Sequence, residues 1–150
     1  MYQDDNIASM ELLKEYVDVK KADLPNISKD LLDNMPHRMV LLRGELGAGK
    51  TTLVKAIIDS LGSKDSGSSP SYSIINQYIL SQGVCYHMDL YRLNTAAEAF
   101  DLGLEEILYG TDMCFIEWPD LIMEWMETPY HVVELEVTDV GRHIKLFSQS

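Results

Sequence analysis

The feature that most constrains the fold is a glycine-rich octapeptide, GELGAGKT, at residues 44–51. A short apolar run, MVLL at residues 39–42, precedes it and is typical of a fully buried strand. Residues 51–61 follow, with apolar side chains spaced as on one side of a helix. A strand, a glycine-rich loop and a helix in this order fit GxxxxGK[ST], the pattern of a phosphate-binding loop. The octapeptide therefore predicts an α/β domain that binds a nucleoside triphosphate.

Each fixed position of this loop has a physical role in holding phosphates. The glycines let the backbone turn tightly, so that N–H groups point at phosphate oxygens, and the helix adds the positive end of its dipole. We expect Lys50 to place its charge between the β- and γ-phosphates, and Thr51 to offer its hydroxyl to Mg²⁺. The loop residues expected to contact the nucleotide are Glu45, Leu46, Gly47, Ala48, Gly49, Lys50, Thr51 and Thr52.

Hydrolysis needs further groups, because Mg²⁺ needs a second anchor and water needs an orienting side chain. Glu117 ends another buried-type run, MCFIE, and is the predicted second metal ligand. Asp89 ends the preceding apolar run and is expected to hold a metal-bound water or to act as a base. Lys50, Asp89 and Glu117 therefore form the predicted catalytic set. Ser71 either reaches Mg²⁺ or the γ-phosphate, or caps a turn. His87 shares a strand face with Asp89, although a lone strand histidine is more often structural.

The rest of the chain predicts one domain with a mixed sheet. Patterns typical of strands lie at residues 15–20, 38–43, 73–80, 84–90, 113–117, 132–137 and 143–147, and helical patterns at 24–35, 51–61, 95–109 and 119–126. The third helical pattern is interrupted near Gly103, and two pairs of strands are close enough for hairpins. We therefore predict an α/β, P-loop NTPase-like three-layer sandwich with a mixed parallel and antiparallel sheet. Residues 1–150 are expected to form a single P-loop ATPase domain, with residues 1–13 as an N-terminal extension.

Charge and cysteine content exclude several other classes of protein. The formal net charge is −12, from 12 basic and 24 acidic residues, whereas stable binding to a nucleic-acid backbone needs clustered Lys and Arg. We expect no direct stable nucleic-acid binding by the chain alone. Cys85 and Cys114 lie in apolar runs and are expected to be buried, reduced thiols. The N-terminus lacks the pattern of a signal peptide, and no apolar run is long enough to span a membrane, so we expect a soluble, cytoplasmic protein.

Several motifs occur together in a fixed order along the chain. They are GELGAGKTTL, SPSYSIINQY, YHMDLYRL, LGLEEIL, FIEWPD and a late GR. Together they closely resemble the TsaE (YjeE) family of bacterial P-loop ATPases, over nearly the whole chain from residue 16 to residue 147. The family usually has SPT where this chain has Ser69-Pro70-Ser71, and Ser71 keeps the hydroxyl.

The resemblance implies a specific function. Members of this family bind ATP and Mg²⁺, hydrolyse ATP slowly alone, and act with the TsaD and TsaB proteins in making threonylcarbamoyladenosine (t6A) in tRNA. By motif match it implies that Lys50 and Thr51 bind phosphate and metal and that Glu117 contacts Mg²⁺. It also implies that Asp89 is the acid of the HxDLYR motif and that Arg142, in the late GR, approaches the nucleotide.

Two other functions fit a phosphate-binding loop. A small-molecule P-loop kinase is the main alternative, but such kinases usually carry an arginine-rich lid. This chain has four arginines, and none lies near another in sequence. A nucleotide switch of the GTPase type is the third possibility, and the absence of the guanine-recognition motif NKxD argues against GTP.

Overall fold

A seven-stranded mixed sheet organises residues 9–63 and 74–149, the parts of the chain that this computed structural model describes. The strand order is β1-β7-β6-β2-β5-β4-β3. The strands are β1 (Glu11–Val19), β2 (Met39–Arg43), β3 (Ile75–Leu80), β4 (Gly83–Asp89), β5 (Met113–Glu117), β6 (Tyr130–Thr138) and β7 (Gly141–Gln149). The central strands β6, β2, β5 and β4 run parallel, whereas β1, β7 and β3 add antiparallel edges. The predicted mixed sheet is thus confirmed.

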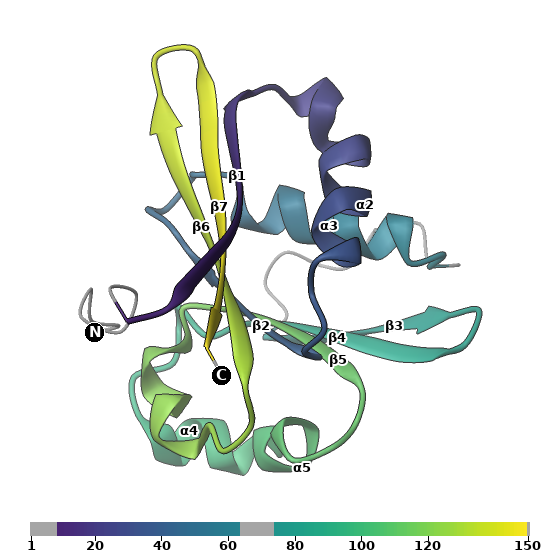
Figure 1. Cartoon of the computed structure of the whole chain (residues 1–150). Coiled ribbons are helices and arrows are strands. Elements are labelled where there is room, and N and C mark those ends of the chain that lie inside the picture. The colour runs from purple at the N-terminus through teal and green to yellow at the C-terminus, as the bar shows by residue number, and fades with distance from the viewer. Residues whose placement is uncertain (1–8, 64–73, 150) are drawn as a thin grey trace.

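Helices cover both faces of this sheet (Figure 1). On one face lie α2 (Leu24–Asp33), which follows the short 3₁₀ turn η1 (Lys21–Asp23), and α3 (Lys50–Ser60). On the other lie α4 (Ala96–Asp101), α5 (Leu104–Leu108) and the 3₁₀ helix η2 (Pro119–Trp125). Each face has its own apolar core, so the predicted three-layer sandwich is confirmed. None of the helices in the described parts of the chain is long and apolar enough to cross a membrane.

The buried-type runs became the central strands for a simple reason. A strand with parallel neighbours and helices on both faces has no solvent-facing side, so most of its side chains are apolar. The first four residues of β2 are buried, and β5 is buried from Cys114 to Glu117. Because parallel strands end at the same edge of the sheet, this arrangement brings the residues after β2, β4 and β5 together.

Some element boundaries differ from the sequence-based expectation. β1 begins at Glu11, so residues 11–13, which we expected in an N-terminal extension, belong to the sheet. The helix expected at residues 119–126 is a 3₁₀ helix. By contrast, the interruption expected near Gly103 within residues 95–109 is confirmed, because α4 ends just before Gly103 and Gly103, with a φ of 80°, is the N-cap of α5. Cys85 and Cys114 are buried and form no disulfide, as expected.

Candidate functional site

The glycine-rich loop adopts a conformation that requires its glycines. A β-carbon on Gly44 would lie 2.7 Å from the Leu135 carbonyl oxygen, too close for any other residue. Gly47 and Gly49 have φ values of 84° and 105°, in the left-handed region that favours glycine. Gly49 is also the N-cap of α3, so the loop leads directly into the positive end of that helix. These features match the cradle expected for phosphate.

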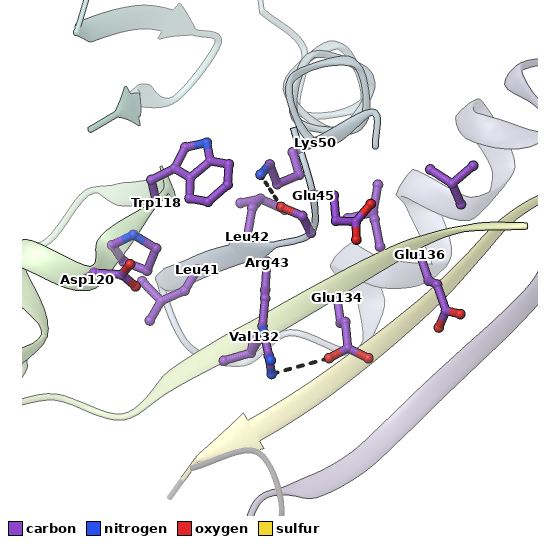
Figure 2. A pocket seen from close by; sticks show the side chains of 14 residues that line it. Leu41, Leu42, Arg43, Glu45, Lys50, Trp118, Asp120, Val132, Glu134 and Glu136 are labelled. Atoms are coloured by element: carbon purple, nitrogen blue, oxygen red, sulfur yellow. Dashed lines mark hydrogen bonds and ion pairs between the residues drawn. The ribbon is translucent and has the colours of Figure 1, made fainter. Parts of the chain in front are cut away.

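Lys50 is the first residue of α3, and its side chain is nearly buried beside the loop. Its Nζ donates a hydrogen bond to the Gly44 carbonyl at 2.5 Å and lies 3.7 Å from the ring centroid of Trp118 (Figure 2). Burial lowers the pKa of Lys50, and the nearby carboxylates of Glu117 and Asp89 oppose that shift. Lys50 is therefore a partly desolvated cation that contacts a carbonyl and an aromatic ring.

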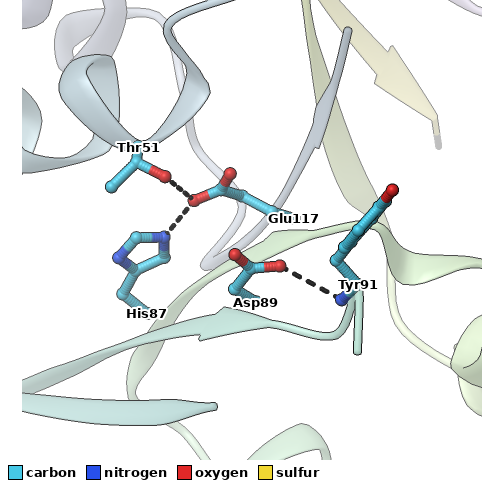
Figure 3. Close-up of polar contacts among 5 residues, drawn as sticks. All are labelled: Thr51, His87, Asp89, Tyr91 and Glu117. Carbon is cyan, nitrogen blue, oxygen red and sulfur yellow. Dashed lines mark hydrogen bonds and ion pairs between the residues drawn. The ribbon is translucent and has the colours of Figure 1, made fainter. Parts of the chain in front are cut away.

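Glu117 links the phosphate loop to β4 through a single carboxylate oxygen. Its Oε2 accepts a hydrogen bond from Thr51 Oγ1 at 2.7 Å and lies 2.5 Å from His87 Nε2 (Figure 3). Glu117 and His87 are buried, being 3% and 4% exposed, whereas Thr51 is exposed. The two residues predicted to hold Mg²⁺ are thus in direct contact, and His87, which we interpreted as structural, belongs to the same cluster.

Asp89 lies beside Glu117 at the ends of paired strands, because it is the β4 partner of Glu117 in the sheet register. Its Oδ1 accepts a hydrogen bond from the backbone N–H of Tyr91 at 3.1 Å (Figure 3). The Tyr91 ring packs against Trp118, with centroids 5.0 Å apart. Asp89 therefore faces the same strand-end region as Glu117, although its hydrogen bond fixes the turn after β4.

Trp118 has a strained backbone that places its ring beside Lys50. Its φ of 56° and ψ of 61° are left-handed values that cost free energy for a residue with a side chain. Nothing in the motif FIEWPD itself shows which way the chain turns after β5. The structure supplies the answer, since the indole covers Lys50.

Cavities open on both sides of the loop. On the Trp118 side a cavity of about 520 Å³ is bordered by Glu45 and Lys50 and contains the ion pair between Arg43 and Glu134, 3.5 Å apart (Figure 2). Leu46, at the loop tip, is 70% exposed.

On the opposite side a cavity of about 370 Å³ lies between the loop, η1 and β7. Ala48, Gly49 and Thr52 border it, together with Arg142. Arg142 Nε donates to the Ala48 carbonyl at 2.8 Å, so this side chain is held against the outer surface of the loop. The structure thus brings Arg142 to the loop, and its expected approach to the nucleotide stays a prediction. Ser71 lies outside the described residues.

The residues expected at the metal do not form a metal site by themselves. No group of three or more His, Cys, Asp and Glu that could hold a metal occurs in residues 9–63 and 74–149. Mg²⁺ in nucleotide sites is usually held by one or two protein oxygens together with substrate phosphates and water. The Thr51 hydroxyl and the Glu117 carboxylate are oxygen donors of this kind, so the donor set fits Mg²⁺ bound together with a nucleotide.

Comparison with known proteins agrees with this geometry. The family model described as "Threonylcarbamoyl adenosine biosynthesis protein TsaE" matches residues 19–144. Several curated relatives are named "tRNA threonylcarbamoyladenosine biosynthesis protein TsaE". The one from Rickettsia felis is 38% identical over 73% of this chain and 64% of that protein. The one from Bacillus subtilis is 43% identical over 71% of this chain and 65% of that protein. The chain therefore spans just under two thirds of the length of these two relatives. For the relative from Haemophilus influenzae the identity is 32%, over 75% of this chain and 71% of that one.

A solved structure supports the same assignment. The crystal structure of Bacillus subtilis YdiB superposes with a TM-score of 0.70 and 27% sequence identity, and the match covers 94% of this chain and 88% of that one. A match over 94% of this chain is not limited to the phosphate loop.

Proposed function

The chain belongs to the TsaE family, and we propose that it binds ATP with Mg²⁺ and hydrolyses the ATP as an accessory of tRNA threonylcarbamoyladenosine synthesis. The observation that carries this proposal is the contact between Thr51, at the start of α3, and Glu117, at the end of β5. It joins a phosphate-binding loop to a strand-end carboxylate, which is the minimum needed to hold a nucleotide-bound metal.

The roles of the site residues follow from their positions. The loop N–H groups and Lys50 bind the phosphates, and Lys50 exchanges its bond to the Gly44 carbonyl for phosphate oxygens. Thr51 and Glu117 hold Mg²⁺, and Asp89 orients water near them or accepts its proton. Bound Mg²⁺ would neutralise charge on the transferred phosphate. Ser71 remains a proposed further contact to the metal or to the γ-phosphate.

The remainder of the nucleotide needs a separate place, and the cavity of about 370 Å³ between the loop, η1 and β7 is suited to it. Thr52 and Arg142 border this cavity, and the guanidinium is already fixed by the Ala48 carbonyl. An arginine held in this way loses little side-chain entropy when a ligand binds. These contacts support the proposal that both residues contact ATP.

We place the modification reaction itself on other proteins. The relatives are named for tRNA threonylcarbamoyladenosine biosynthesis, whereas a net charge of −12 disfavours direct binding of this chain to tRNA. The chain is therefore proposed to work in the cytoplasm with TsaD and TsaB, and to supply ATP hydrolysis to their cycle. The small-molecule kinase alternative is not favoured, because the matching family model and the curated relatives are all named TsaE.

The decisive experiment is phosphate release from ATP, measured for the protein alone and with TsaB and TsaD from the same organism. We expect slow release alone and faster release with both partners, and the Lys50→Ala variant as a control should abolish both signals. Equal rates with and without partners would overturn the accessory role while leaving the ATPase assignment intact.

Replacement of Glu117 tests the metal assignment separately. We expect Glu117→Ala to bind ATP but to hydrolyse it at least about tenfold more slowly, because a metal ligand is lost. Calorimetric titration with ATP and phosphate release would be measured on the same preparation. Wild-type turnover in this variant would mean that another residue holds the metal.

A further inference from the structure

His87 reaches the candidate site from below the surface. It lies two residues before the end of β4, and its sheet partner Phe115 lies equally far before Glu117 on β5. The imidazole therefore approaches the carboxylate from the core side, and it is only 4% exposed. On the side of the phosphate loop, the Glu117 carboxylate contacts Thr51.

The direction of the bond between His87 and Glu117 follows from chemistry. An ionised carboxylate can only accept hydrogen bonds, so the hydrogen lies on His87 Nε2. Both groups are buried, and a buried carboxylate is costly unless it is hydrogen-bonded. Oε2 takes bonds from both His87 and Thr51, while the second carboxylate oxygen points away from His87 (Figure 3).

We propose that His87 is a positioning residue that holds the Glu117 carboxylate in the orientation required for Mg²⁺. This inference rests on the proposed function, because it assumes that Glu117 meets a nucleotide-bound metal. His87 does not touch ATP or Mg²⁺ itself. It fixes one oxygen of Glu117, so that the carboxylate does not rotate toward the strand-end solvent when Thr51 turns its hydroxyl from Glu117 to the metal. Partners of this type commonly set the affinity of a metal site.

A pair of substitutions separates positioning from packing. In His87→Gln the amide nitrogen can take the place of Nε2, whereas in His87→Asn the side chain is too short to reach Glu117. Both are polar and smaller than histidine, so they disturb the core in similar ways. If His87→Asn does not fold, His87→Leu provides a second variant that cannot donate a hydrogen bond to Glu117.

The measurement is calorimetric binding of ADP, first in EDTA and then at increasing Mg²⁺. We expect all variants to bind ADP in EDTA within about threefold of wild type. The Mg²⁺ concentration that gives half of the metal-dependent increase in affinity should rise about tenfold or more in His87→Asn and stay within about threefold in His87→Gln. An unchanged Mg²⁺ requirement in a folded His87→Asn protein would overturn the inference.

A double-mutant cycle tests whether His87 acts through Glu117. In a Glu117→Gln background, His87→Asn should cause no further rise in the Mg²⁺ requirement, because the group it positions has been replaced. Additive effects would contradict the inference. His131→Gln is the matched control, a buried histidine elsewhere in the sheet that should leave the Mg²⁺ requirement unchanged. If Mg²⁺ has no effect on ADP binding by the wild-type protein, the proposed function itself fails. That result differs from an unchanged Mg²⁺ requirement in His87→Asn, which overturns only the inference about His87.

Discussion

The two ends of the parallel strands carry charged side chains with different kinds of partner. At the carboxyl end, Glu117 contacts Thr51 and His87, both through side-chain atoms. At the amino end, before β2, Arg38 donates to backbone carbonyls of Leu108 and Asp112, the latter at 2.9 Å. These carbonyls belong to other parts of the fold and fix Arg38 in place, whereas the carbonyl bonded by Lys50 lies in the phosphate loop beside a cavity. Side chains that bond to one another beside a cavity can exchange those partners for a ligand.

The buried histidines show the same contrast. His87 donates to a carboxylate, whereas His131 bonds only to backbone groups among the contacts of the described residues. His131 Nε2 accepts from the His37 backbone N–H at 3.1 Å, so its hydrogen is on Nδ1, which donates to the Phe147 carbonyl at 3.2 Å. Burial and residue type do not separate a structural histidine from one at a site. The hydrogen-bond partner does separate them. Substitutions at the carboxyl end should therefore affect ligand binding, whereas those at the amino end should affect stability.

The largest effect is expected at the carboxyl end, from Lys50→Ala. Removing the cation should weaken ATP binding by about 100-fold or more, because charge-assisted bonds to phosphate are lost. The unfolding midpoint should change little, since the partners of Lys50 are one carbonyl and the Trp118 ring. Calorimetry and thermal unfolding would be compared. Retained ATP affinity would contradict the assignment of the phosphate loop.

At the amino end, Arg38→Ala should produce the opposite pattern. The carbonyls at the end of α5 and before β5 would lose their donor, at a cost of about 2–3 kcal/mol in the free energy of unfolding. ATP affinity should remain within about twofold of wild type. Arg92→Ala, at an exposed arginine, is the control and should change neither quantity. A loss of ATP affinity without a loss of stability would break the comparison between the two ends.

The pH dependence of stability should report His131. Burial lowers the pKa of His131 to about 4 in the folded protein, below its ordinary value near 6.5. Folding therefore favours the neutral form of His131. Its contribution to the free energy of unfolding is complete above pH 6.5. That contribution declines as the pH falls from 6.5 to about 4, where His131 is protonated in the folded state as well. We expect a loss on the order of 2 kcal/mol over that range.

Denaturant unfolding of wild type and His131→Gln at several pH values would measure this contribution. The variant should be less stable at pH 7 but lose less stability on acidification, because it lacks the titrating group. Parallel pH profiles for the two proteins would show that His131 is not the residue responsible.

The smallest effect is expected from Arg142→Ala, which lies between the two classes. Arg142 is at the candidate site, yet its Nε bonds to the backbone carbonyl of Ala48. We expect ATP affinity to fall about fivefold, near 1 kcal/mol, with a similarly small loss of stability. Arg43→Ala, on the opposite side of the loop, serves as the control. A large loss of stability with unchanged affinity would move Arg142 into the structural class.

The boundaries that sequence patterns predicted well are those fixed by burial. β2, α3 and β5 lie close to the expected positions, because each has a continuous apolar run or a helical stripe. The start of β1 was missed because it is an edge strand whose first residues are exposed or half-buried, so it lacks a clear alternating pattern. The 3₁₀ form of η2 was missed because its spacing resembles that of a short α-helix.

The sequence by itself determined the phosphate loop, because its glycines, lysine and threonine are consecutive and their roles depend on local backbone conformation. Only the tertiary structure decided which distant side chains meet that loop. Glu117 is 66 residues from Thr51, and Arg142 is 94 residues from Ala48. The role of His87 depends on the register of β4 against β5, which is set by packing across the whole sheet and has no signature in either strand.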